Sequence, residues 1–247
     1  MEHQIYIGTS GWSYRHWMKV FYPEDLKPSQ FLEYYFKHFN SVEINSSFYH
    51  LPKMATVQRW KEISPPEFRF CVKLSRFITH RKKLSEVSEP LDRFFEVFES
   101  LRSKMGPVLI QLPPSMRWNR NLIENFLQEL VNRFSGYQFA LEARHSSWDN
   151  QKAVEILKFY GIAMVIAHSG KRFPYFEKST ANFSYYRFHG PAELYASNYS
   201  DKLLQEFAIK IKKDTEEGKT VWAFFNNDFG GFAIANARRL RQLVTSV

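Results

Sequence analysis

Charged side chains follow apolar runs at several points of the chain. The stretch FALEARHSSW opens with an apolar run at Phe139 and then carries Glu142 and Arg144, two residues apart. Side chains two apart in a strand point to the same face, so this carboxylate and this guanidinium share one. Arg187 and His189 have the same spacing. Carboxylates beside guanidinium and imidazole groups can bind anions and move protons.

Other apolar segments show the same pattern. VEIN places Glu43 and Asn45 on one face, FCVKL carries Lys73, and VLIQL carries Gln111 near its end. Burying charges inside a protein is unfavourable, and apolar residues often hold a core together equally well. A charged set drawn from several strands therefore predicts a ligand-binding or catalytic pocket.

The elements that must position these residues are short apolar strands alternating with amphipathic helices. Strands are predicted at 5–10, 41–46, 68–74, 107–112, 138–144, 162–168, 183–190 and 220–227. Helices are predicted at 28–39, 54–62, 90–104, 121–134, 153–160, 201–218 and 232–244. Near-continuously apolar strands are typical of a parallel sheet covered on both sides. The pattern predicts an α/β fold, a single TIM (β/α)8 barrel over residues 1–247, with its site at the C-terminal rim.

An open, doubly wound sheet is the alternative fold. That fold usually carries GxGxxG after its first strand, and GTSGWSY has a different spacing. The segment from 169 to 182 contains Pro174, so we expect an irregular connection there instead of a helix.

Composition points to a soluble, basic protein. Lys and Arg number 34 against 25 acidic residues, a formal net charge of +9, which favours anionic partners. The single cysteine, Cys71, excludes an intrachain disulfide and is expected to be buried. The N-terminus resembles no signal peptide, and the apolar run IAMVIA is too short to cross a bilayer. We therefore expect a cytoplasmic protein with no membrane partner.

Basic and aromatic residues are frequent in the predicted strand-to-helix segments. Their rings could stack on sugars or bases or pack loops onto the barrel. The residues from these segments and from the strand ends that we expect to bind ligand are Trp12, Asn45, Tyr49, His80, Gln111, Arg144, His145, Trp148, Arg187, Asn226 and Asn227.

Taken together, the motifs closely resemble one family. IGTSGWSYRHW with FYP, VEINSSFYHLP, VKLSRFITH, QLPP, EARHSSW, YYRFHG and FFNND occur in this order. The chain is similar to the YecE-like proteins, domain of unknown function 72, from Ile5 to Leu240. The resemblance implies a TIM barrel but no activity, and it marks the residues Gly11, Trp12, Glu43, Asn45, Phe48, Tyr49, Lys73, His80, Gln111, Pro114, Glu142, Arg144, His145, Trp148, Arg187, His189, Gly190, Asn226 and Asn227. His168 stands where relatives often place an acid.

The first functional hypothesis is an enzyme or binder for a small anionic ligand, phosphorylated or sugar-like. Arg144 and Arg187 would hold the anion through their planar forks. The catalytic candidates are Glu43, Glu142, Lys73 and His189, with a glutamate as general base and Lys73 or His189 as acid or electrophile. Because Glu142 shares a face with Arg144, Glu43 is expected to be the freer carboxylate.

Two alternatives remain open. One is a metal-dependent, nuclease-like enzyme acting on nucleic acid, with Glu43, Glu142, His168 and His189 as metal ligands. Inward-facing arginines and lysine oppose bound cations, so we predict no metal and no cofactor. The other is a non-catalytic protein that binds nucleic acid or another polyanion. The sequence does not decide the substrate, the reaction class or the oligomeric state.

Overall fold

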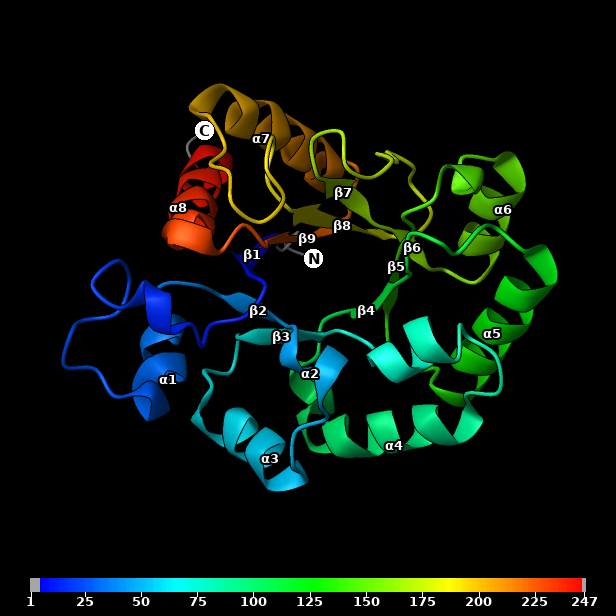
Figure 1. Ribbon diagram of the computed structural model, residues 1–247, viewed down its shortest axis with the longest axis horizontal. Coiled ribbons are helices and arrows are strands. Elements are labelled where there is room, and N and C mark those ends of the chain that lie inside the picture. The colour runs from blue at the N-terminus through cyan, green and yellow to red at the C-terminus, as the bar shows by residue number, and fades with distance from the viewer. Residues whose placement is uncertain (1–4, 246–247) are drawn as a thin grey trace. The chain divides into compact units, whose positions relative to one another are not determined.

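The computed structural model describes residues 5–245, which form parallel strands alternating with helices (Figure 1). The strands are β1 (Ile5–Thr9), β2 (Ser41–Ile44), β3 (Arg69–Val72), β4 (Val108–Gln111), β5 (Phe139–Glu142), β6 (Ala163–Met164), β7 (Ile166–His168), β8 (Phe183–Phe188) and β9 (Thr220–Phe225). The α-helices are α1 (Phe31–Phe36), α2 (Ser46–Tyr49), α3 (Met54–Ile63), α4 (Ser88–Phe98), α5 (Arg120–Arg133), α6 (Gln151–Phe159), α7 (Asp201–Glu216) and α8 (Phe232–Thr245). The predicted α/β class with parallel strands is confirmed.

The described chain divides into two compact units. Unit 1 contains the residues up to Glu43, Ile166–Tyr175 and the residues from Asn182 onward. Unit 2 contains Ile44–Val165 and Phe176–Ala181. The strands form three sheets, and no closed barrel is recorded among the described residues.

Unit 1 is built on a parallel sheet with the order β1-β9-β8-β7. Tyr186 of β8 and Ile7 of β1 both lie opposite Ala223 of β9. A parallel bridge from Ser10 to Glu43 brings the end of β2 beside β1. Helices α7 and α8, orange and red, lie side by side in this unit (Figure 1). This sheet places the ends of β1, β2, β8 and β9 near one another.

Unit 2 is built on a parallel sheet with the order β4-β5-β6. Strand β3 joins it through parallel bridges from Phe70 to Met105 and from Lys73 to Leu109. Buried side chains of α4 and α5, such as Phe94 and Leu130, show that the apolar faces of these helices contribute to the core. The carboxyl ends of β3, β4 and β5 therefore lie at one edge of this sheet.

The predicted strand 162–168 is divided at Val165. Before this residue the segment pairs with β5, and the Val165 amide donates a hydrogen bond to Leu141 O. After it, Ile166 pairs with Tyr186 of β8. The segment changes its pairing partner at this point, so two short strands form where one apolar run predicted one strand.

Three of the long helices have a polar N-cap residue. Asn119, Asn150 and Ser200 accept hydrogen bonds from the amides of Leu122, Ala153 and Leu203, which open α5, α6 and α7. Such side chains satisfy amides that have no partner in the first turn. These caps define where α5, α6 and α7 begin.

The connection between β7 and β8 is irregular over residues 169–182, as Pro174 predicted. Its second half is tied to unit 2 by Thr180, which is 5% exposed. The Thr180 hydroxyl accepts a hydrogen bond from Met164 N and donates one to Ile162 O, both at 2.7 Å. This contact holds residues 176–181 against the start of β6.

Several short helical elements were not predicted, and two of them lie close to the candidate site. These two are α2 and a π-helical turn over Phe77–Arg81 that follows β3. Each spans about one turn, which is too short to show an apolar period. Both belong to unit 2 and lie next to residues of the candidate site.

Candidate functional site

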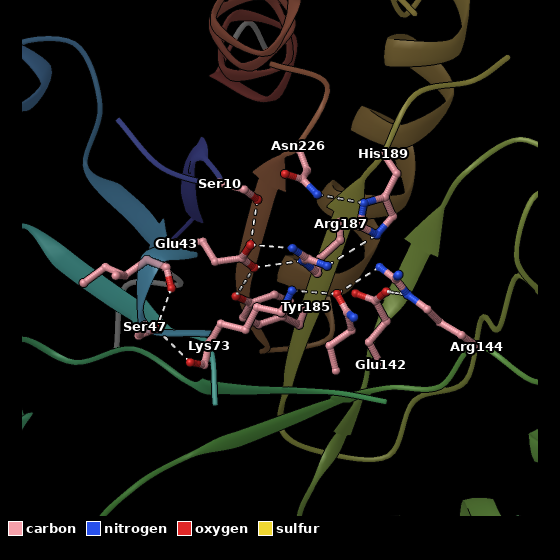
Figure 2. A network of polar contacts seen from close by, with 12 residues as sticks. Ser10, Glu43, Ser47, Lys73, Glu142, Arg144, Tyr185, Arg187, His189 and Asn226 are labelled. Carbon is pink, nitrogen blue, oxygen red and sulfur yellow. Dashed lines mark hydrogen bonds and ion pairs between the residues drawn. The ribbon is translucent and has the colours of Figure 1, made fainter. Parts of the chain in front are cut away.

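The first polar cluster lies in unit 1 and centres on Glu43. Its carboxylate accepts hydrogen bonds from Arg187 at 2.6 and 2.9 Å, from Ser10 Oγ at 2.6 Å and from Tyr185 Oη at 2.8 Å (Figure 2). The Glu43 and Arg187 side chains are fully buried. We call Ser10, Glu43, Tyr185 and Arg187 the Glu43 cluster. Its two charges cancel, so it behaves as a neutral, tightly bonded pair.

His189 extends this cluster through its ring nitrogens. Nε2 lies 3.4 Å from Arg187 Nη1, and Nδ1 lies 3.1 Å from the Asn226 amide (Figure 2). The Arg187 guanidinium and Asn226 Nδ2 are both hydrogen-bond donors, and a neutral imidazole has one acceptor nitrogen. A neutral His189 ring therefore accepts from one of these two neighbours at a time, and the Asn226 contact is the shorter one.

The second polar cluster lies in unit 2, at the ends of β3, β4 and β5. Lys73 Nζ and Arg144 Nη2 both donate to Gln111 Oε1, at 2.8 and 2.9 Å. Arg144 Nε also donates to Glu142 Oε1 at 2.5 Å (Figure 2). We call Lys73, Gln111, Glu142 and Arg144 the cationic cluster, because two cations meet one carboxylate in a largely buried place.

The pKa of His80 reflects its burial and the positive charge of the cationic cluster beside it. Burial, together with the charges of Lys73, Arg144 and Arg76, lowers the pKa of His80 to about 4. The ring therefore stays neutral at pH 7. Phe48 connects the two, because Lys73 Nζ lies 3.9 Å above its ring and His80 contacts it edge-on at 5.0 Å.

Two predicted ligand-binding residues, His145 and Trp148, make contacts that hold a loop in place. His145 Nδ1 accepts a hydrogen bond from Ser147 N and caps a short turn. Trp148 is fully buried and its Nε1 donates to Met116 O. Both contacts fix the segment that follows β5, so these two side chains support the cationic cluster from outside it.

The remaining candidates have separate environments. Asn227 is buried and its amide donates to Ser197 O and Asn236 Oδ1. Trp12 and Asn45 are half-buried, while Tyr49 is 65% exposed. The structure therefore assembles two compact clusters within its units, and the partners of the Asn227 amide, Ser197 and Asn236, belong to neither of them.

One expectation about the carboxylates is wrong. Glu43 was expected to be the freer of the two glutamates, yet Arg187, 144 residues away, holds both of its oxygens. The spacing of charges within one strand shows local pairs such as Glu142–Arg144, but not pairs between strands. Arg187 is likewise engaged by Glu43 through two nitrogens, which makes it a poor receptor for an anion.

The described residues contain no group of three or more His, Cys, Asp or Glu side chains placed to hold a metal ion. His168, a ligand in the metal-dependent hypothesis, contacts Tyr199 Oη through Nδ1 at 3.0 Å. Burial and the charge of Lys210 lower the pKa of His168. Of the described helices, none has the length and apolar character needed to cross a membrane.

Family comparison agrees with the motifs. The model of the family described as "Protein of unknown function DUF72" matches residues 6–247. The chain belongs to the DUF72 family. The UPF0759 protein YecE of Escherichia coli K12 is 33% identical over 143 residues, which is 57% of this chain and 48% of YecE. The chain thus matches about half the length of that relative.

Other relatives of this DUF72 chain match it over nearly its full length. The UPF0759 protein YunF of Bacillus subtilis 168 is 24% identical over 97% of this chain and 94% of its own. The crystal structure of a DUF72 family protein, TM1631 from Thermotoga maritima, has a TM-score of 0.81 at 32% identity, covering 98% of this chain and 100% of that one. A second, EF0366 from Enterococcus faecalis, has a TM-score of 0.85 at 21% identity, covering 98% and 96%, and shows the fold alone.

Proposed function

We propose that the cationic cluster of unit 2 binds a small anionic ligand, such as a phosphate ester. Lys73 and Arg144 carry two positive charges, and Glu142 supplies one negative charge. His80 is neutral at pH 7 because its pKa is lowered to about 4. The cluster therefore keeps one excess positive charge, which an anion would neutralise.

The single observation that carries the proposal is the shared acceptor. Two cationic side chains point at one amide oxygen, Gln111 Oε1. Two positive charges that share one acceptor repel each other, and the repulsion is stronger where little water surrounds them. An anion placed against Lys73 and Arg144 would relieve this repulsion, and the planar fork of Arg144 suits a phosphate or carboxylate.

Glu142 and the Glu43 cluster then have supporting roles. Glu142 accepts from Arg144 Nε and orients the guanidinium. Glu43, saturated by Arg187, Ser10 and Tyr185, is a better anchor than a general base. Proton transfer remains assigned to Lys73, His189 or Glu142 as a prediction. A metal-dependent mechanism is disfavoured because Lys73 and Arg144 repel cations.

We also propose that the strands close into one (β/α)8 barrel forming a single domain in the cytoplasm. The strand order follows the chain, β7-β8-β9-β1 with β2 in unit 1 and β3-β4-β5-β6 in unit 2. The backbone passes from one unit to the other within β2 and at Val165. An experimental structure with these strands in two separate, open sheets would contradict closure.

Titration with inorganic phosphate tests the anion site. We expect Lys73→Met and Arg144→Met each to weaken phosphate binding by about tenfold or more, because a charged hydrogen bond contributes about 1.5–3 kcal/mol. Lys152→Met, on exposed α6, is the matched control and should bind normally. Isothermal titration calorimetry measures the affinities, and thermal melts confirm folding.

A second readout needs no variant. A bound anion should raise the pKa of His80 from about 4, because negative charge nearby favours the imidazolium. NMR titration of the His80 ring with and without phosphate measures this change. An unchanged His80 titration, or equal phosphate binding in all variants, would refute the anion site.

A further inference from the structure

A groove of about 920 Å³ lies in unit 2, outside both polar clusters. Its walls come from the segment after α2, the π-helical turn Phe77–Arg81 with the loop that follows it, and the start of α4. A volume of this size suits a ligand of several rings or a nucleotide. The groove is therefore large enough for a ligand much bigger than the anion alone.

Two aromatic rings on this groove are unusually exposed. Tyr49 is 65% exposed and Phe77 is 42% exposed, and both line the groove. Large aromatic side chains usually bury most of their surface. Flat exposed rings on a groove wall are typical of sites that stack a planar ligand group.

Contacts through Phe48 connect the groove wall to the cationic cluster. Tyr49 contacts Phe48 edge-on at 5.0 Å, and Lys73 Nζ lies above the same Phe48 ring. Phe77 belongs to the turn that carries His80, and His80 contacts Phe48 as well. One ring, Phe48, thus contacts both the groove wall and the cationic cluster.

The backbone around the groove is also held in uncommon conformations. The segment over Phe77–Arg81 forms a π-helical turn. Lys83, Leu84 and Glu86 have positive φ angles of 50°, 68° and 52°. π-helical turns and strained, left-handed non-glycine residues gather at ligand sites, where their cost is tolerated for function.

We propose that this groove binds the base of a nucleotide, whose phosphate occupies the cationic cluster. The aromatic wall complements a planar heteroaromatic ring, and the adjoining positive charge complements the phosphate. Ser75, Glu86 and Glu89 on the wall supply hydrogen-bond acceptors for ring amino groups. The phosphate half of this assignment rests on the anion site proposed above, while the base half rests on the groove.

The test compares AMP, ribose 5-phosphate and inorganic phosphate by calorimetry on the full chain. Because stacking on an aromatic ring contributes about 1–3 kcal/mol per base, AMP should bind at least about fivefold more tightly than ribose 5-phosphate. Tyr49→Ala and Phe77→Ala should remove this difference and leave phosphate binding unchanged. Phe159→Ala, which removes a ring 81% exposed on α6, is the control and should change nothing.

The outcomes separate the two proposals. If phosphate binds in a Lys73-dependent way and AMP binds no better than ribose 5-phosphate, the base subsite is refuted and the anion site stands. A preference for AMP that survives both aromatic substitutions also refutes the subsite. If none of the three ligands binds, both proposals fail.

Discussion

Glu43 and Arg187 form a bidentate ion pair that is closed off from solvent, and Ser10 and Tyr185 complete the shell of the carboxylate. Removing one partner of such a pair leaves the other charge buried without compensation. The pair therefore stabilises the arrangement of β1, β2 and β8 only as long as both members are present.

Substituting Glu43→Gln should lower the free energy of unfolding by about 3–5 kcal/mol. Urea denaturation measures the change. Glu24→Gln, which removes the acid of an exposed ion pair with Lys19, is the control and should cost about 1 kcal/mol or less. A double-mutant cycle with Arg187→Met should show that the double variant is less destabilised than the sum of the two single variants. Near-normal stability of Glu43→Gln would contradict a stabilising role for the buried ion pair.

Much of the polar set could be predicted from individual residues, but its pairing could not. Glu142 and Arg144 are two apart in one strand, so their contact was visible in the sequence. Glu43 in β2 and Arg187 in β8 meet through the tertiary arrangement in which β1 and β9 lie between these two strands. Spacing along the chain contains no sign of that arrangement. The sequence likewise did not show that Gln111 accepts from both Lys73 and Arg144, because these two residues follow different strands.

The longer helices followed the periodic pattern of apolar residues, because each is long enough to show its period, and the strands followed the short, near-continuously apolar runs. The exceptions have physical reasons. The run 162–168 divides because it changes pairing partner at Val165. The turn Phe77–Arg81 and α2 are too short to show an apolar period, so among the ligand-binding residues expected from the sequence only Tyr49 lines this groove.

Packing of β1 on β2 depends on Gly8. A Cβ atom at this position would lie 2.0 Å from Ser41 O and 2.9 Å from Tyr35 Oη. Gly8→Ala should therefore destabilise the protein by about 1–3 kcal/mol, as expected for overpacking. Thermal unfolding measures it. Gly161→Ala is a useful contrast, because no atom lies within 4 Å there and only its φ of +66° opposes the change. Equal, small effects at both positions would contradict close packing at Gly8.

The chain as a whole crosses between its two units four times. Unit 1 is made of three separate segments and unit 2 of two. Independent domains are usually continuous and joined by flexible linkers, whereas here β2 itself carries the chain across. This connectivity supports the proposed single domain, and the formal net charge of +9 supports anion capture by the molecule at long range.

Unfolding should accordingly occur in one cooperative step. We expect tryptophan fluorescence and far-ultraviolet circular dichroism to give coincident urea transitions, since neither unit is a continuous piece of chain that could fold alone. Trp17 and Trp222 report on unit 1, and Trp60 and Trp148 report on unit 2. Two resolved transitions would show that the units are separate folding domains.

The Thr180 contact limits where the connection between β7 and β8 can change in length during evolution. Thr180 fastens residues 176–181 to the backbone of Ile162 and Met164, so added residues there would pull the hydroxyl from both partners. Residues 169–175 lie ahead of that fastening. Insertions that lengthen this connection in divergent copies of the gene should accumulate before Phe176, and deletions should stop short of Thr180.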